Sequence, residues 1–395
     1  LFFYVTVDPR HIYSFHRSMM ASSLHFCVLG AGIVGLSTAL ELKTQYPGCQ
    51  ITLICERSKH ETTSYGAGGF LEPYNIQGTP NAKVNEWFQY SFKHFQQCEQ
   101  NGVVGVHSVQ AYNLYHPDAE QEEKIPFWSQ IVREFHQITG EERQQLRNTL
   151  GPHIELADEG CCTYGSIIAD QSHYLPWLTS HLIHTLGNVR VIELPQKLSS
   201  LHHVTQVFPP SAGCTLICNC TGFGSYYLQD VQDTALVPVR GQVVRIKKPT
   251  TCNNVAYTYS AVNDFTYVLP NHDTIVLGGT AEQNQFELVV DHEVTNRVLG
   301  NAIAFLPELK HNLQVVKAWT GRRPTRSPLR MEIEEGLGGG GGARLPPVLH
   351  LYGHGGCGVT IGIGSAHDAV VNVVKPFLEQ RRRQRNSDGS RRSKI

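Results

Sequence analysis

The fold is decided by the stretch Phe26-Cys27-Val28-Leu29-Gly30-Ala31-Gly32-Ile33-Val34-Gly35-Leu36. Its apolar opening predicts a buried parallel strand, and the residues after its glycines have the apolar spacing of a helix. A second apolar run, residues 51–54, ends close to the acidic residue Glu56. Strand, Gly-x-Gly-x-x-Gly turn, helix, strand and acid in this order predict a dinucleotide-binding unit.

The three glycines of this unit each have a predicted role. Gly30 allows the tight turn, Gly32 lets the backbone approach a pyrophosphate, and Gly35 lets the helix pack close to the strand. The helix N-terminus offers free N–H groups and a positive dipole end to the phosphates, and Glu56 is placed to bind a ribose hydroxyl. An ordinary strand–turn–helix also contains such glycines, and the unit alone does not separate NAD from FAD.

The bulk composition excludes several classes of function. The chain has 395 residues, enough for a large core and two domains, and a formal net charge of −1, which leaves no overall footprint for nucleic acid. No apolar run approaches the roughly 20 residues that span a bilayer, so we expect neither a nucleic-acid nor a membrane partner. The 11 cysteines include no Cys-x-x-Cys pair, which predicts reduced core thiols in an intracellular protein and no metal site.

The two ends of the chain differ from its body. Residues 1–23 contain the first methionines only at Met19 and Met20 and show no signal-peptide order, so we expect an N-terminal extension without a role in the fold. Residues 379–395 predict a basic, flexible tail. The tail ends in Ser393-Lys394-Ile395, which is similar to the Ser-Lys-Leu peroxisomal address that an import receptor reads. This favours a peroxisomal location, or otherwise a cytoplasmic one.

Two further glycine loops are found in the sequence, at residues 62–74 and 353–360. Residues 62–74 combine hydroxyls with glycines, as in a loop that lies flat against a large ring or a phosphate. Residues 348–352 predict a strand that runs into the glycine loop 353–360 and then into a helix that ends at 378. A second helix N-terminus can therefore point at the same ligand as the first.

The middle of the chain predicts a second structural unit. Helices are expected at residues 82–100, with an aromatic stripe facing the core, and within 118–150. From residue 236 the apolar period changes to two, which predicts antiparallel strands. They are expected at 237–246, 257–259, 265–269 and 274–277, followed by a helix over 286–305.

Taken together, these stretches resemble the family of D-amino-acid oxidases and D-aspartate oxidases, which are FAD enzymes. The resemblance extends over about residues 24–378, and its blocks at 321–330 and 352–360 are the specific ones. The other matching blocks are 28–39, 62–74, and 265–270 with 277–280.

The resemblance implies an α/β fold, in which a Rossmann-like, doubly wound FAD-binding domain carries a second, mixed antiparallel-sheet substrate domain. The FAD-binding domain would comprise residues 24–80, 155–225 and 318–378, and the substrate domain residues 81–154 and 226–317. By match, the residues around FAD would be Gly30, Ala31, Gly32, Ile33, Val34, Gly35 and Glu56 at the ADP half, Arg57, Thr62, Thr63 and Ser64 near the pyrophosphate and ribityl chain, Gly69, Phe70 and Leu71 along the flavin, and Gly355, Cys357, Gly358, Val359 and Thr360 at its pyrimidine edge.

The implied reaction moves a hydride from the Cα of a D-amino acid to flavin N5, and oxygen then reoxidises the flavin. Because the cofactor carries the chemistry, the protein must mainly orient the substrate. We expect Arg323 to hold the substrate carboxylate through two parallel hydrogen bonds, Tyr267 to donate its hydroxyl to it, and the carbonyl of Gly356 to accept from the amine. His354 is expected to be a loop residue and not a catalyst.

Two alternatives for these side chains stay open from the residues alone. Arg322, Arg326 and Arg330 lie close to Arg323 in the sequence, so Arg323 could be one structural arginine among four. On a strand, Arg322 would face the opposite way from Arg323. Tyr267 could be an aromatic that only packs across strands.

Three positions depart from the family pattern. A second active-site tyrosine is replaced by Asn263, and the two arginines of D-aspartate oxidases are replaced by Ser260 and Ala281. A second substrate carboxylate buried without a cation is unfavourable, so we expect neutral or broad D-amino acids first and D-aspartate second. His272, Tyr257 or Tyr259 could restore binding of an acidic side chain, and residues 238–243 and 279–280 resemble the D-aspartate branch.

Other classes are weighed against this interpretation. A glycine or sarcosine oxidase shares the FAD scaffold, and a flavin-binding member without activity would lack the intact set of Tyr267, Arg323 and Gly356. An NAD dehydrogenase is disfavoured because the glycine loops at 62–74 and 353–360 fit a larger buried cofactor. The sequence is compatible with an oligomer and does not define one.

Overall fold

The computed structural model describes residues 24–56, 62–74, 76–121, 123–202, 204, 213–262, 264–337 and 345–392, with the backbone alone for Asn312 and 388–392. The predictions for residues 1–23, Arg57, Asn263 and the C-terminal tripeptide lie outside these ranges.

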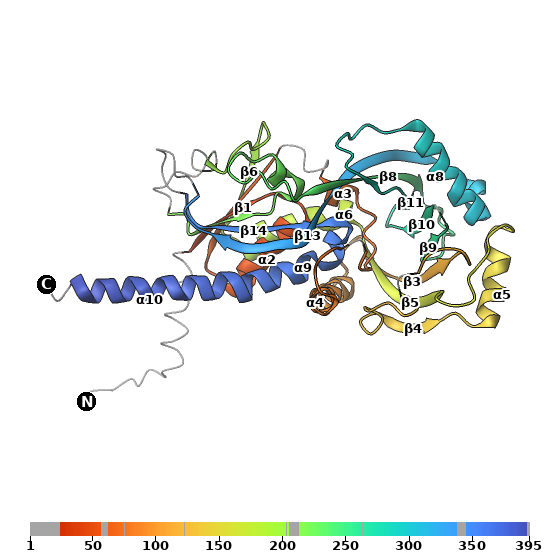
Figure 1. Cartoon of the computed structure of the whole chain (residues 1–395), viewed down its shortest axis with the longest axis horizontal. Helices are drawn as coiled ribbons and strands as arrows, with labels where there is room; N and C mark the ends of the chain where they lie inside the picture. The colour runs from red at the N-terminus through yellow and green to blue at the C-terminus, as the bar shows by residue number, and fades with distance from the viewer. Residues whose placement is uncertain are drawn as a thin grey trace, which may run out of the picture.

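One mixed sheet forms the framework of the described chain (Figure 1). Its 14 strands follow the order β4-β5-β3-β9-β10-β11-β8-β13-β14-β7-β1-β2-β6, and β12 pairs with β8 beside this path. The all-parallel part of the sheet comprises β14 (Val348–His354), β7 (Leu216–Asn219), β1 (His25–Leu29), β2 (Gln50–Glu56) and β6 (Val189–Leu194). The remaining strands are β3 (Val106–Tyr115), β4 (Arg133–Gln137), β5 (Cys162–Ala169), β8 (Val237–Lys247), β9 (Val255–Ser260), β10 (Phe265–Pro270), β11 (Thr274–Gly278), β12 (Glu282–Gln283) and β13 (Val315–Glu334).

Strand β13 joins the parallel part of the sheet to the other part. From Val315 to Thr325 it pairs with β8, and from Arg330 to Glu334 it pairs with β14, antiparallel in both cases. The predicted α/β fold with a Rossmann-like part and a mixed, largely antiparallel part is confirmed. One continuous sheet crosses the predicted domain boundary at β13, so the sheet itself does not mark where one domain ends and the other begins. The predicted domain boundaries therefore remain predictions.

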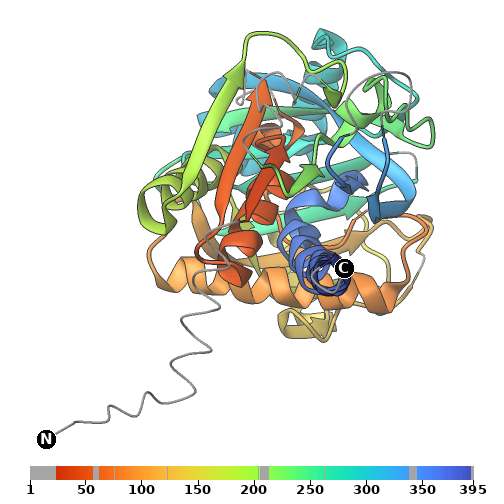
Figure 2. The ribbon, with the colours of Figure 1, turned by 90° about the vertical axis from the view of Figure 1, so that its left-hand side faces the viewer.

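The helices gather largely on one face of the parallel strands. In Figure 2, which looks along the C-terminal helix, α4 (Asn81–Gln100) runs across the view, and it packs against α9 (Gly358–Asp368). The helices are α2 (Ile33–Gln45), α3 (Thr63–Gly66), α4 (Asn81–Gln100), α5 (Gly140–Thr149), α6 (Gln171–Ser180), α8 (His292–Phe305), α9 (Gly358–Asp368) and α10 (Lys375–Arg392). Short π-helical turns at His181–Leu186 and Ala369–Val374 follow α6 and α9.

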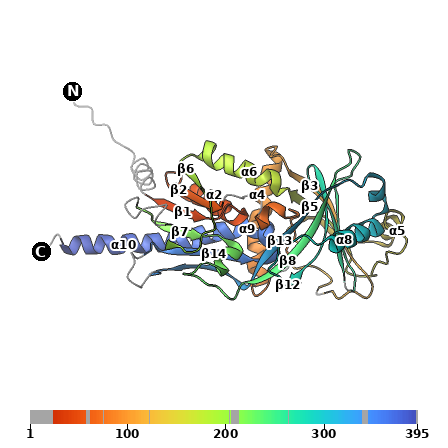
Figure 3. The ribbon, with the colours of Figure 1, turned by 90° about the horizontal axis from the view of Figure 1, so that it is seen from above.

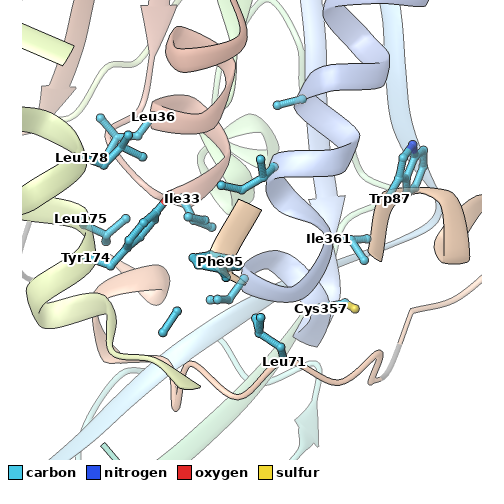
Figure 4. Close-up of a cluster of buried hydrophobic side chains, with 14 of the residues drawn as sticks. Ile33, Leu36, Leu71, Trp87, Phe95, Tyr174, Leu175, Leu178, Cys357 and Ile361 are labelled. Carbon is cyan, nitrogen blue, oxygen red and sulfur yellow. The ribbon is translucent and has the colours of Figure 1, made fainter. Parts of the chain in front are cut away.

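The main core lies where α2, α4, α6 and α9 meet (Figure 4). Trp87 and Phe95 of α4 are buried there together with Ile361 of α9, as the predicted aromatic stripe requires. The two helices approach very closely at Gly364, where a Cβ would fall 2.1 Å from the Trp87 carbonyl oxygen. A larger residue at this position would push α9 away from α4 and from the sheet.

Three predicted segments differ from the structure. Residues 133–137 form the edge strand β4 and not a helix, because they pair with β5, a partner that local sequence does not reveal. Helix α8 begins at His292 and not at 286, because the Asp291 side chain accepts from the backbone N–H groups of Glu293 and Val294 and caps it.

The third difference is at the C-terminus. Helix α10 continues to Arg392, past the predicted end at 378, through residues rich in arginine and glutamine, which favour helix. Figure 3 shows α10 projecting from the end of the molecule opposite α5 and α8.

The helical run Gly355–Ser387 is long and apolar enough to cross a membrane by composition, with a mean hydropathy of 1.3. However, 72% of its apolar window is buried inside the molecule. Burial in the core of the fold accounts for the apolar character of this run.

Candidate active site

A cavity of about 1180 Å³ lies where the parallel and antiparallel parts of the sheet meet. It is larger than the pockets of about 300–1,000 Å³ that typically hold small ligands. The predicted site residues that line it are Gly30, Ala31, Gly32, Ile33, Val34, Glu56, Thr62, Thr63, Ser64, Gly69, Phe70, Tyr267, Arg323, Gly355, Gly356, Gly358, Val359 and Thr360. Segments from widely separated parts of the sequence therefore converge on one site.

Gly35, Leu71 and Cys357 do not line this cavity. A Cβ on Gly35 would fall 1.9 Å from the Gly30 carbonyl oxygen, so Gly35 serves the packing of α2 against the turn. Leu71 and Cys357 are fully buried in the main core. Burial raises the pKa of the Cys357 thiol to about 12, which keeps it unreactive.

The glycine turn places the N-terminus of α2 at the cavity. Gly30 has φ +101°, and a Cβ there would fall 2.6 Å from the Cys220 carbonyl oxygen, so this position requires glycine. The N-cap Gly32 has no side chain to accept from the first N–H groups of α2. One of them, from Ile33, donates to Ser64 Oγ at 3.0 Å. The helix end therefore offers its dipole and backbone donors to an anion in the cavity.

The N-terminus of α9 faces the same cavity. Its N-cap, Cys357, makes no capping hydrogen bond, and Gly358, Val359 and Thr360 line the cavity wall. The Thr360 hydroxyl donates to the Glu72 carbonyl oxygen at 3.0 Å, which ties α9 to the glycine loop at 62–74. Two helix N-termini thus point at one site, as the two glycine loops predict.

Arg323 extends from β13 across the neighbouring strand. Its Nη1 donates to the Thr280 carbonyl oxygen at 2.8 Å, and its guanidinium lies against Gly241 of β8. Within the described ranges no carboxylate forms an ion pair with Arg323, although the other three arginines of this run have partners. Arg323 is therefore a half-buried cation that lines the cavity with hydrogen-bonding capacity left over.

The other three arginines are held by other partners, although Arg322 also lines the cavity. Arg322 donates to the Tyr227 hydroxyl at 3.1 Å and stacks over the Phe223 ring, on the opposite side of β13 from Arg323, as strand alternation requires. Arg326 pairs with Asp233, and Arg330 pairs with Glu332 and Glu334.

Tyr267 of β10 shares the backbone segment 278–280 with Arg323. Its ring covers Gly278 and Gly279, where a Cβ would fall 2.1 and 2.7 Å from ring carbons. Burial raises the pKa of the Tyr267 hydroxyl, and the nearby Arg323 charge offsets part of that rise. The hydroxyl is therefore protonated at neutral pH and can donate a hydrogen bond.

Gly356 lies under an aromatic pair at the cavity. A Cβ on Gly356 would fall 2.9 Å from a ring carbon of Tyr74, and Tyr74 stacks on Phe265 with ring centroids 5.8 Å apart. Phe265 in turn contacts Tyr267 edge to face at 5.7 Å. Gly356 and Tyr267, two of the residues predicted to contact substrate, are thus linked through a short chain of aromatic contacts.

Comparison with known proteins decides the family. The model of the DAO family, described as FAD dependent oxidoreductase, matches residues 25–370. The chain belongs to this family. A D-aspartate oxidase from Homo sapiens is 30% identical over 87% of this chain and 92% of its own length. A D-amino-acid oxidase from Rubrobacter xylanophilus is 28% identical over 87% of this chain and 93% of its own length.

Solved structures give the same fold at lower identity. A glycine oxidase from Bacillus cereus has a TM-score of 0.64 at 18% identity, with 88% of this chain and 93% of that chain covered. The cofactor of this FAD-dependent oxidoreductase is FAD, and the cavity fits it. The cavity is large, two helix N-termini without side-chain caps face it, and glycines keep its walls clear of side chains.

His354 has the character of a structural residue in this oxidoreductase. It is buried, and its Nε2 shares a hydrogen bond with Ser365 Oγ at 2.8 Å. Burial lowers the pKa of His354 to about 3, so the ring is neutral at physiological pH. His354 also lines the cavity, and the expectation that it is not the catalyst stays a prediction.

The prediction that His272, Tyr257 or Tyr259 could take the place of the missing arginines is wrong. His272, Tyr257 and Tyr259 do not line the cavity. Tyr257 stacks on Tyr112 at 5.5 Å, and the Tyr259 hydroxyl donates to a backbone carbonyl, because both side chains point into the second hydrophobic core. Ser260 and Ala281 do line the cavity, where they bring no charge.

Among the polar residues of the cavity wall that sequence reasoning missed are Glu72, Asn113 and Thr258. Asn113 Nδ2 donates to Glu72 Oε1 at 3.3 Å, and the Tyr164 hydroxyl donates to Glu72 Oε2 at 2.9 Å. Burial raises the pKa of the Glu72 carboxyl to about 7. An acidic residue inside the glycine loop at 62–74 was the available signal for Glu72, whereas Asn113 and Thr258 carry none.

Proposed function

We propose that the protein catalyses the oxidative deamination of D-amino acids to 2-oxo acids, ammonia and hydrogen peroxide. Its substrates would be neutral D-amino acids or a broad range of D-amino acids. The observation that carries this proposal is the Arg323 guanidinium, which lines the cavity without a carboxylate partner among the described residues, close to the Tyr267 hydroxyl. A guanidinium of this kind suits a substrate carboxylate.

FAD would be held by residues that already converge on the cavity. The α2 N-terminus, including Gly30, Gly32 and Ile33, would bind the pyrophosphate, and Glu56 at the end of β2 would bind the ribose. Thr62, Thr63, Ser64 and the unplaced Arg57 would lie along the phosphates and ribityl chain, Gly69 and Phe70 along the flavin, and Gly355, Gly358, Val359 and Thr360 at its pyrimidine edge. The α9 N-terminus would stabilise negative charge at that edge. When bound, FAD accepts the hydride from the substrate Cα and passes electrons to oxygen.

Orientation of the substrate is the work of this chain's own residues. Arg323 and Tyr267 would hold the carboxylate, and the Gly356 carbonyl would accept from the amine. With two substituents fixed and the hydrogen aimed at a flat cofactor, the side chain of the D-enantiomer has a single free direction. His354 is buried and neutral, and we assign it no role as a base. The substrate amine would therefore bind in its neutral form.

The preference for neutral over acidic substrates rests on the charge of the cavity wall. Ser260 and Ala281 line it without a cation, and Glu72 adds a carboxyl group. A second substrate carboxylate would be buried without a partner there. D-Aspartate oxidation is the second candidate, and the 30% identity to a human D-aspartate oxidase favours it. Glycine or sarcosine oxidation is a third, on the basis of the shared fold alone.

Anaerobic flavin bleaching tests the proposal. The purified protein should be yellow, and D-alanine and D-norleucine should bleach it without oxygen, whereas D-aspartate and sarcosine should act much more slowly. A colourless protein, or one that only D-aspartate or only sarcosine bleaches, would contradict this proposal.

We also propose a peroxisomal location, with an import receptor as the partner that reads Ser393-Lys394-Ile395. A peroxide-forming activity agrees with that compartment. A fluorescent fusion at the N-terminus should enter peroxisomes, and deletion of the tripeptide should leave it in the cytoplasm. A cytoplasmic signal from the intact fusion would contradict the proposal.

A further inference from the structure

One row of side chains crosses the cavity wall from the proposed carboxylate anchor to a half-buried acid. Tyr267 of β10 pairs with Thr258 of β9, and Thr258 pairs with Asn113 of β3. Residues directly opposite one another on neighbouring strands lie on the same face of a sheet, and all three line the cavity. The row therefore leads from Tyr267 to Asn113, and Glu72 lies beyond Asn113 in hydrogen-bond contact with it.

The end of this row is a fixed polar group. Thr258 Oγ1 donates to Asn113 Oδ1 at 2.9 Å, which turns the Asn113 amide so that its Nδ2 donates to Glu72. The Tyr164 hydroxyl donates to the other carboxylate oxygen of Glu72, and Tyr164 is fully buried. The position of the Glu72 carboxylate is thus set by two neutral donors from β3 and β5.

Glu72 has no cationic partner. Across the part of the chain that the structure places, no lysine, arginine or histidine forms an ion pair with it. A carboxylate that is largely removed from water is costly unless a cation balances it. Burial raises the pKa of Glu72 to about 7, in keeping with this missing cation. A positive charge that entered the cavity would be stabilised here.

The distance from Tyr267 to Asn113 determines how long a substrate side chain must be to extend from the proposed carboxylate anchor to Glu72. Neighbouring strands lie about 4.8 Å apart, so roughly 10 Å separates Tyr267 from Asn113. A short substrate held at Arg323 ends well before Glu72, whereas a side chain of several methylenes extends towards it.

We propose that Glu72 selects D-amino acids whose long side chain ends in a cation, such as D-lysine, D-ornithine or D-arginine. This inference rests on the proposed function and narrows its broad substrate range: neutral D-amino acids are still oxidised, and those with a long cationic side chain are oxidised best. The carboxylate anchor at one end of the cavity and the Glu72 carboxylate at the other match the two charged ends of such a substrate. The same charge disfavours D-aspartate and D-glutamate, whose side-chain carboxylate would face Glu72.

D-Lysine and D-norleucine make a matched pair for the test, because they differ only in the terminal ammonium. Their kcat/KM values are measured by peroxide release from the holoenzyme, at a pH one unit above the Glu72 pKa of about 7, where the lysine ammonium is still charged. The wild type should favour D-lysine by about tenfold, and Glu72→Gln should abolish this preference while D-norleucine stays within about twofold.

Glu120→Gln is the matched control. Glu120 is an exposed carboxylate that lines the same cavity, so its removal changes the net charge by the same amount and should leave the preference unchanged. Retained yellow absorbance shows that each variant is folded. Equal loss of preference in both variants would overturn the specific role of Glu72.

The outcomes separate this inference from the function on which it rests. If the wild type oxidises D-norleucine as well as or better than D-lysine, or if Glu72→Gln keeps the preference, the role of Glu72 is wrong and the oxidase activity stands. The wild-type comparison decides the matter even where Glu72→Gln fails to fold. If no D-amino acid reduces the flavin, the proposed function is wrong, and the role of Glu72 falls with it.

Discussion

The guanidinium of Arg323 lies against the backbone of Gly241, so closely that a Cβ on Gly241 would fall 2.5 Å from Nη1 and 2.7 Å from Cζ. The two residues are diagonal neighbours, because Gly321 of β13 pairs with Gly241 of β8. The absence of a side chain at one position therefore sets the place of the charge at the other. This relationship allows the proposed carboxylate anchor, Arg323, to be displaced without removing it.

Gly241→Ala should move the Arg323 guanidinium while leaving its charge in place. Misplacement of a binding group by about 1 Å can lower the rate about 100-fold, and we expect a loss of kcat/KM for D-norleucine of that order. The flavin should stay bound. Gly300→Ala is the control, since a Cβ on Gly300 has nothing within 4 Å. Full activity of Gly241→Ala would show that the position of Arg323 does not matter.

Arg323→Met should remove the carboxylate anchor. Since the only hydrogen bond of the Arg323 side chain to another described residue is to the Thr280 carbonyl, the variant should fold and bind FAD, with kcat/KM at least about 100-fold lower. Arg323→Lys should recover only part of it, because an ammonium cannot form two parallel bonds. Arg330→Met should keep kcat/KM, since Arg330 is engaged with Glu332 and Glu334. Similar losses in Arg323→Met and Arg330→Met would contradict a specific anchor.

Tyr267→Phe should remove the hydroxyl and keep the ring, so that the contribution of each can be measured separately. The ring keeps its contacts with Gly278 and Gly279, so thermal unfolding should be unchanged. Loss of one hydrogen bond to the substrate carboxylate should raise KM about tenfold. Steady-state kinetics and a melting curve of the holoenzyme check both statements. An unchanged KM would make Tyr267 a packing residue, the alternative that the sequence leaves open.

The pH dependence of stability should report on Glu72. Its pKa is raised from 4.5 to about 7 in the folded chain, so the folded state binds the proton more tightly than the unfolded state does. Stability contributed by the protonated group is fully present below pH 4.5 and is lost as the pH rises towards 7. The melting temperature of the wild type relative to Glu72→Gln should therefore fall over this window. A constant difference between the two curves would show that Glu72 titrates normally.

Local patterns predicted β1, α2, β2 and the glycine loops, because each signal lies within a few consecutive residues. The glycine at position 30 is needed by its own φ angle, and Gly35 is needed by the contact with Gly30 five residues before it. Such requirements can be recognised in the sequence because both partners stand in one motif. Arg323 and Tyr267 could be identified only through the family resemblance. In the sequence alone, Arg323 cannot be told from the three neighbouring arginines, and Tyr267 cannot be told from an aromatic that only packs across strands.

The wall of the cavity could not be predicted in the same way. Asn113 and Thr258 are separated by 145 positions and meet because β3 and β9 are neighbours in the sheet. Residues 133–137 likewise become a strand only because β5 offers a free edge. Pairing between distant strands depends on tertiary packing, to which local propensity contributes little.

The central claim is that Arg323, Tyr267 and Gly356 orient a D-amino acid over the flavin. Its most direct test is anaerobic reduction of the purified holoenzyme by the two enantiomers of norleucine, followed by flavin absorbance. We predict that D-norleucine bleaches the flavin and that L-norleucine leaves it yellow. Bleaching by the L-enantiomer, or by neither enantiomer nor any other D-amino acid, would contradict the account.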